Sequence, residues 1–148
     1  MAQKKPKIVR PSSVVPSGLK EPKAAFDPDS NLNRKAAWRV HRIHMADPYG
    51  WHELNVGSVL DIKEKLSHFE SMTWNDIFTI GRTRNHKILV EKLRCPKAKH
   101  WMKENMPDQD SLWTLRLSGA ERIWGIFSDG VYQIIFWDPK HLIYPVQH

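Results

Sequence analysis

Cysteine is nearly absent from this chain of 148 residues, in which Cys95 is the only one. A single thiol cannot form an internal disulfide, and it excludes a zinc site built on several thiolates. No segment approaches the ~20 consecutive apolar residues that a membrane-spanning helix needs, and the N-terminus lacks the apolar core of a secretory signal. We therefore expect a protein of the reducing cytoplasm that does not use a membrane.

Glycine is also scarce, with seven residues. They form no glycine-rich phosphate loop and no dinucleotide-binding fingerprint, and no serine-nucleophile elbow is present. Eight histidines occur, but their spacing does not favour a metal. His41 and His44 are three residues apart, so they would lie on opposite faces of a strand. No glutamate completes the two-histidine helix motif of metalloproteases. We expect neither a metal nor a cofactor.

Tryptophan is abundant instead, with seven residues, and such large rings predict a packed core. Rings that stay exposed would suit stacking on bases or contact with a partner protein. Charge is uneven, because residues 1–36 hold eight basic and three acidic side chains, a net +5 out of +7. The same segment contains five prolines. We expect residues 1–36 to be a disordered basic tail and residues 37–148 to be one domain.

The first two thirds of this domain carry a strand signal followed by helix signals. Residues 37–45 have the β-branched and aromatic content of a strand. Helix starts are expected at a Ser58 cap, at a Thr73 and Asp76 pair, and at Pro96, whose helix runs to about Met106.

The last third changes to the pattern of strands. We expect strands at 112–117, 122–127 and 131–137, joined by tight turns. Residues 131–137 are nearly all apolar or aromatic, which predicts a central strand buried on both faces. Residues 142–144 would add an edge strand. The order predicts an α+β domain with an N-terminal strand, two to three helices on one face of the sheet, and a C-terminal antiparallel β-meander.

Arg116 and Arg122 lead the candidates for chemistry, because they flank one tight turn and so lie on neighbouring antiparallel strands. Two arginines can bind a phosphate and stabilise the charge of its transition state. His141 and Tyr144 follow the next strand, and a histidine can transfer a proton near neutral pH. Together these residues would suit cleavage of RNA by the adjacent 2′-hydroxyl. The structural alternative is that Arg116 pairs with a carboxylate across the sheet and that His141 hydrogen-bonds the turn before it.

The stretch RLSGAERIW, residues 116–124, resembles the hairpin of RelE/ParE-type toxins, in particular their YoeB branch. There an arginine, an apolar residue and a small hydroxyl residue precede a short turn, and a second arginine opens the next strand. The turn at Ser128, the apolar strand after it and His141 follow in a similar order. The resemblance covers about residues 113–144. It implies a RelE-like fold and a small toxin that cleaves mRNA, often in the ribosomal A site, and is silenced by a cognate antitoxin protein.

The resemblance also implies roles for single residues. Arg122 matches the arginine that contacts the phosphate, and His141 matches the C-terminal general acid. Tyr144 corresponds more loosely to the tyrosine of the RelE branch. We assign no counterpart to the carboxylate base of the YoeB branch. The implied mechanism requires no metal.

Further candidates for contact with nucleic acid are Arg82, Arg84, His86 and Lys87, which form the densest basic loop of the domain, and Lys140. A solvated loop is the alternative. The leading hypothesis is a metal-independent endoribonuclease toxin that acts on mRNA at the ribosome. Residues 111–148 hold three basic and three acidic side chains, which favours a second hypothesis, a non-catalytic module that binds a protein or a nucleic acid. A third is a ParE-type poison of DNA gyrase, which shares the fold.

Overall fold

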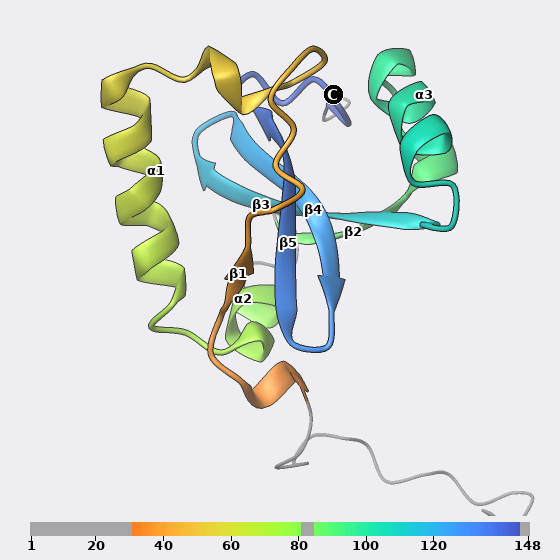
Figure 1. Cartoon of the computed structure of the whole chain (residues 1–148). Helices are drawn as coiled ribbons and strands as arrows, with labels where there is room; N and C mark the ends of the chain where they lie inside the picture. The colour runs from red at the N-terminus through yellow and green to blue at the C-terminus, as the bar shows by residue number, and fades with distance from the viewer. Residues whose placement is uncertain (1–30, 81–84, 146–148) are drawn as a thin grey trace, which may run out of the picture.

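The computed structural model describes residues 31–80 and 85–145. It is an α+β fold in which five strands form one mixed sheet among three α-helices (Figure 1). The helices are α1 (Val56–Phe69), α2 (Trp74–Ile80) and α3 (Pro96–Asn105), with short 3-10 turns η1 (Asn31–Asn33), η2 (Trp51–Glu53) and η3 (Val90–Lys92). The strands are β1 (Trp38–Arg39), β2 (His86–Leu89), β3 (Ser111–Ser118), β4 (Glu121–Ser128) and β5 (Val131–Asp138).

The sheet is built around a C-terminal meander. Its order is β1-β5-β4-β3-β2, with β1 parallel to β5 and the other pairs antiparallel. Asp129 and Gly130, with φ of 54° and 80°, join β4 to β5 in the way that a two-residue hairpin loop requires. The three predicted meander strands are confirmed within one residue of their ends. However, β4 lies at the centre of the sheet, whereas β5 is an inner strand beside β1.

Helices cover both faces of this sheet, with α1 and α2 on one side and α3 on the other (Figure 1). One core cluster joins Ile62, Trp74 and Ile77 to Leu115, Leu117, Ile123, Tyr132 and Ile134. The other joins Ala98 and Met102 of α3 to Leu112, Trp124, Ile126, Ile135 and Phe136. The prediction of helices on one face was therefore wrong. The reason is that β4 and β5 carry apolar side chains on both faces, and each face needs a covering layer.

Three segments differ from their predictions. The strand predicted at 37–45 is limited to the two residues of β1, after which the chain turns and Ile43 N donates to Val40 O (3.0 Å). Residues 142–144 are not a strand, because Ile143 O accepts from the backbone N–H groups of Arg94 (3.1 Å) and Cys95 (3.2 Å). The loop predicted around His86 instead contains β2, which forms the edge of the sheet opposite β1.

The starts of the helices settle further predictions. Asn55, and not Ser58, caps α1, since Asn55 Oδ1 accepts from Ser58 N (2.9 Å). The capping pair before α2 is confirmed, because Asp76 N donates to Thr73 Oγ1 (3.1 Å) and Thr73 N lies 3.4 Å from Asp76 Oδ2. The start of α3 at Pro96 is confirmed as well.

The boundary predicted at residue 36 is placed too late. Ala36 is buried in the core, and Arg34 O accepts from Trp74 N (3.0 Å), so residues 31–36 belong to the folded domain. Residues 1–30 of the predicted tail lie outside the described residues.

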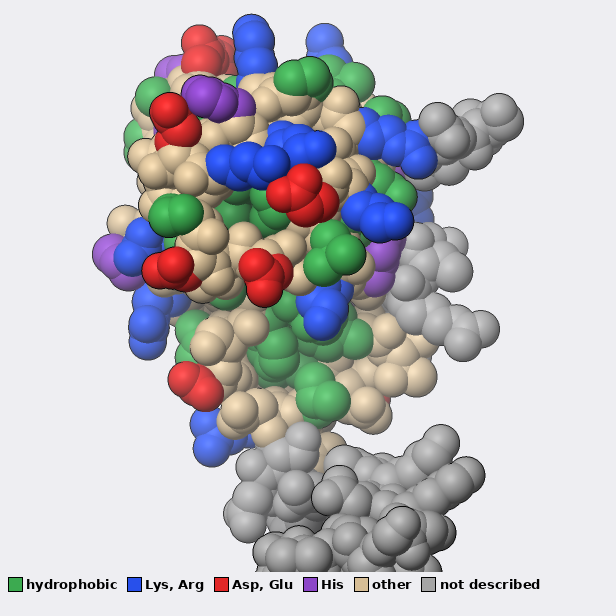
Figure 2. Space-filling view, turned by 90° about the vertical axis from the view of Figure 1, so that its right-hand side faces the viewer, with side chains coloured by type: hydrophobic (Ala, Val, Ile, Leu, Met, Phe, Trp, Pro, Cys, Tyr) green, Lys and Arg blue, Asp and Glu red, His purple; other side chains and the backbone are tan. Residues whose placement is uncertain are grey.

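Charge on the described part of the chain is nearly balanced, with 15 basic and 13 acidic side chains. Figure 2 looks onto the side of the molecule that carries α3, and Lys and Arg side chains alternate there with Asp and Glu. Glu91, for example, lies 3.0 Å from Lys103 Nζ and 4.0 Å from Lys99 Nζ. This side therefore presents no extended field of one sign. Among the described helices, none is long and apolar enough to cross a membrane.

Candidate active site

The register of the meander places Arg116 and Arg122 side by side. Arg116 of β3 is the direct partner of Arg122 of β4, which is in turn the partner of Asp138 at the end of β5. Directly paired residues project from the same face of a sheet. The three side chains therefore form one row, which we call the arginine row. It lies on the face that α3 packs against, because Trp124, two residues from Arg122, belongs to the α3 core cluster.

Both arginines are partly engaged by the turn between their strands. Arg122 Nη1 donates to Gly119 O (2.7 Å) and to Glu121 O (3.2 Å), and Arg116 Nε donates to Gly119 O (3.1 Å). Arg122 is 8% exposed, whereas Arg116 is half-buried. These contacts hold Arg122 Nη1 and Arg116 Nε against the turn. The anticipated pairing of Arg116 with a carboxylate is replaced by this bond to the turn.

Asp138 anchors the segment that carries His141. Its carboxylate is fully buried and accepts from Leu142 N (2.9 Å), Ile143 N (2.9 Å) and Trp124 Nε1 (3.2 Å). His141 lies inside the turn closed by these bonds and has a left-handed backbone, with φ of 58°. Asp138 thus hydrogen-bonds the turn, in place of the predicted bond from His141.

A second row lies beside the arginine row on the same face. His86 of β2 is paired with Thr114 of β3, which is two residues before Arg116 and is paired with Trp124. His86 Nδ1 and Thr114 Oγ1 are both buried and have no hydrogen-bond partner. A third such atom in the described part of the chain, Trp38 Nε1, belongs to a residue packed in the core on the other face. Two of the three unpaired buried atoms therefore belong to directly paired residues of this site.

The charge of Arg122 affects the pKa of both His86 and His141. Burial lowers the pKa of His86 below its usual 6.5, and the positive charge of Arg122 lowers it further. Burial and then Arg122 also lower the pKa of His141, with His86 contributing in the same direction and Asp138 opposing. One arginine therefore acts on two histidines that are far apart in the sequence. Both imidazoles favour the neutral form at neutral pH.

Other predicted residues lie elsewhere. The Tyr144 ring packs against the guanidinium of Arg94, 4.9 Å from ring centroid to Cζ. Lys87 points to the opposite face from His86, and its Nζ lies 5.8 Å from the centroid of the Trp113 ring. Lys140 is exposed and helps to line a pocket of about 390 Å³. Arg82 and Arg84 lie outside the described residues.

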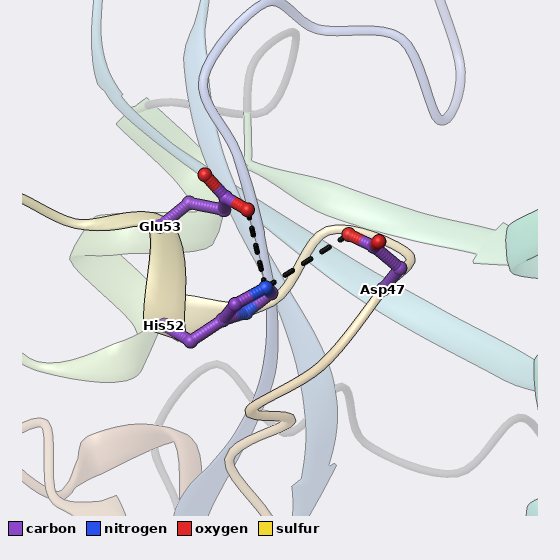
Figure 3. Close-up of side chains that lie close together, drawn as sticks. All are labelled: Asp47, His52 and Glu53. Carbon is purple, nitrogen blue, oxygen red and sulfur yellow. Dashed lines mark ion pairs between the residues drawn. The ribbon is translucent and has the colours of Figure 1, made fainter.

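A separate group of possible metal ligands occurs in the loop before α1 (Figure 3). His52 Nε2 lies 3.1 Å from Glu53 Oε2 and 3.9 Å from Asp47 Oδ1. All three residues are exposed. Contacts of this kind are ordinary surface ion pairs, so we assign no function to the group.

Comparisons of the chain with protein-family models, with curated proteins and with solved structures found no match. The case for a function therefore depends on the geometry of the site. The sequence predicted Arg116, Arg122 and His141 as site residues, and it did not point to Thr114. It placed His86 among nucleic-acid contacts and not beside Arg122. The pairing of β2 with β3 places His86 beside Thr114. A four-residue edge strand has too short a sequence pattern to predict this pairing.

Proposed function

We propose that this protein is a RelE-like toxin, a metal-independent endoribonuclease that cleaves mRNA at the ribosome and is held inactive by an antitoxin protein. The observation that carries the proposal is the position of Arg122. It is paired with a second arginine across the sheet, and its charge acts on His86 and His141. A phosphate-binding pair beside proton-transfer groups is what phosphodiester cleavage needs. The resemblance of residues 113–144 to the YoeB branch supports the same reading.

The proposed chemistry uses the 2′-hydroxyl of RNA as the nucleophile. Arg116 and Arg122 bind the non-bridging oxygens of the scissile phosphate and stabilise the charge that grows on them. His141 donates a proton to the departing 5′-oxygen. The buried carboxylate of Asp138 holds the backbone of the turn that contains His141. The turn therefore does not depend on a hydrogen bond from the imidazole, which is left for proton transfer.

The second candidate is a non-catalytic binding module, and a specific surface favours it. An apolar groove of about 530 Å³ runs between β1 and α1 and is lined by residues that include Trp38, Val40, Trp51 and Val59. Val40 is 62% exposed and Val59 is 49% exposed. Exposed apolar surface next to aromatic rings is typical of protein interfaces.

Growth after induced expression in bacteria, followed by mapping of mRNA ends, separates these functions. We compare the wild type with His141→Asn and Arg122→Gln. Asparagine tolerates the left-handed backbone at position 141. His100→Asn is the matched control, because His100 is an exposed residue of α3. We expect growth arrest with new mRNA ends for the wild type and the control, and a loss of cleavage of about 100-fold or more for the two variants.

Other outcomes would contradict the proposal. Equal cleavage by His141→Asn would remove His141 from the mechanism. Normal growth with intact RNA would favour the binding module, and DNA damage with intact RNA would favour a poison of gyrase.

A further inference from the structure

We propose that His86 is the general base of this site and that Thr114 is its positioning residue. This inference rests on the proposed ribonuclease function and deepens it, because it supplies the group that activates the 2′-hydroxyl. The resemblance to the YoeB branch assigns no residue to this role. On the same face of the sheet as the arginine row, the edge strand β2 carries the imidazole of His86.

The position of His86 is fixed by its neighbour. Asn85 is 8% exposed, and its Oδ1 accepts from Arg116 N (2.7 Å) while its Nδ2 donates to Ile77 O (3.2 Å). The start of β2 is thereby tied to β3 at the arginine row and to α2. His86 follows directly and faces Thr114, one row away from Arg116. Rows on one face are about 7 Å apart, so the imidazole and the guanidinium groups are near enough to act on one nucleotide.

The role of Thr114 as a positioning residue is inferred from two unpaired buried atoms. His86 Nδ1 and Thr114 Oγ1 are buried, complementary in hydrogen bonding and carried by directly paired residues. An unpaired buried polar atom costs about 1–3 kcal/mol, so neither atom serves stability here. Hydrogen bonds of catalytic groups commonly tighten only when substrate binds. In the bound state Nδ1–H donates to Thr114 Oγ1, which sets the tautomer and leaves Nε2 as a free base.

The charges around the two imidazoles distinguish their roles. The charged and titratable groups that face them are Arg116 on β3, Arg122 on β4, Asp138 at the end of β5, and each other. Burial and Arg122 favour neutral His86, which is the form that accepts a proton. The carboxylate of Asp138 acts on His141 in the opposite sense to Arg122 and so supports its protonated form. The proposed function assigns the acid to His141, and this leaves the role of the base to His86.

The step balances within the site. The proton of the 2′-hydroxyl passes to His86 Nε2 as the 2′-oxygen forms a bond to phosphorus. The bond from phosphorus to the 5′-oxygen breaks, and His141 donates its proton to that oxygen. The products are a 2′,3′-cyclic phosphate and a 5′-hydroxyl. Exchange of one proton from His86 and one proton to His141 through water restores both residues.

The test measures RNA cleavage by the purified full chain on ribosomes that carry message, over a range of pH. We expect the kcat/KM of the wild type to peak below pH 6.5, because the pKa values of both histidines are lowered from that value. His86→Gln should cleave about 100-fold more slowly and lose the acidic limb of the pH profile, which reports the base. Binding of a message with a 2′-deoxy cleavage site should not change, and His100→Gln, the matched control, should match the wild type.

Thr114 gives a second and independent variant. Thr114→Val removes an unpaired oxygen and should leave the melting temperature unchanged or higher while lowering the rate about tenfold. Thr114→Ser keeps the hydroxyl and should restore the rate. If the wild type cleaves RNA but His86→Gln keeps its rate and its acidic limb, the role of His86 is overturned and the ribonuclease stands. If the wild type leaves RNA intact, the proposed function itself fails.

Discussion

At the scale of single residues, Asp138 links the fold to the site. Its buried carboxylate accepts three N–H bonds, from Trp124 of β4 and from the backbone of Leu142 and Ile143. A bond to a charged group contributes about 1.5–3 kcal/mol, and a buried donor left unpaired costs about 1–3 kcal/mol. One side chain therefore closes the end of the sheet and sets the backbone of His141. Asp138 thus has a structural role in this part of the chain.

Replacing Asp138 should reveal how much its hydrogen bonds stabilise the fold. Asp138→Asn keeps the shape but turns one acceptor oxygen into an NH₂ group, which faces an N–H donor. We expect the free energy of unfolding in urea to fall by about 2–3 kcal/mol. Asp129→Asn is the control, because Asp129 is exposed in a hairpin turn where asparagine is equally suited to a positive φ. Equal stability of the two variants would show that the Asp138 bonds contribute nothing net.

At the scale of elements, the start of α1 offers a clear comparison. Asn55 Oδ1 accepts from Ser58 N, while Ser58 lies inside the first turn. Asn55→Ala should lower the free energy of unfolding by about 1 kcal/mol, the usual cost of losing a cap. Ser58→Ala should be neutral or slightly stabilising, because alanine has the higher helix propensity. The reverse order in urea denaturation would place the start of the helix at Ser58.

Elements were predictable from the sequence where their signal is local. The meander followed from alternating apolar residues and from the Asp-Gly turn, both of which act over a few residues. β2 did not, because His86 and Lys87 are polar and only Ile88 of this strand is buried. Its stability comes from pairing with β3, whose partner residues lie 22 (Leu89 to Ser111) to 28 (His86 to Thr114) positions later in the chain. At α1 two good capping residues stand three apart, and tertiary packing chooses between them.

At the scale of the whole molecule, the site combines residues placed by a local turn with residues placed by long-range strand pairing. Arg116 and Arg122 could be placed on neighbouring strands from the sequence alone, because one tight turn joins those strands. Their direct pairing could not, because the register shifts between Arg116 and Ser118. His86 and Thr114 could not, because their place beside Arg122 depends on a long-range strand pair. The same limit explains the error over the helices. Apolar strands show that both faces are buried, but they do not show which helix covers which face.

The two half-buried histidines of the site should also set how stability depends on pH. The folded pKa values of His86 and His141 lie below the ordinary value of 6.5. Above that pH both are neutral in the folded and the unfolded chain, and they add no pH dependence. Below it, the unfolded chain takes up protons that the folded chain resists, so the free energy of unfolding falls as the pH falls. Urea denaturation at about pH 7.5 and about pH 5.5 should show this loss.

A double variant isolates the contribution of this pair. His86→Gln with His141→Asn removes both groups and should flatten the fall in stability between the two pH values. The matched control is His41→Gln with His100→Gln, because both of these histidines are exposed, and it should keep the slope of the wild type. If the double variant loses as much stability on acidification as the control does, then the folded protein does not resist protonation of His86 and His141. The paired proton-transfer roles would then lose their electrostatic basis, while the proposed contact of the arginine row with a phosphate would be unaffected.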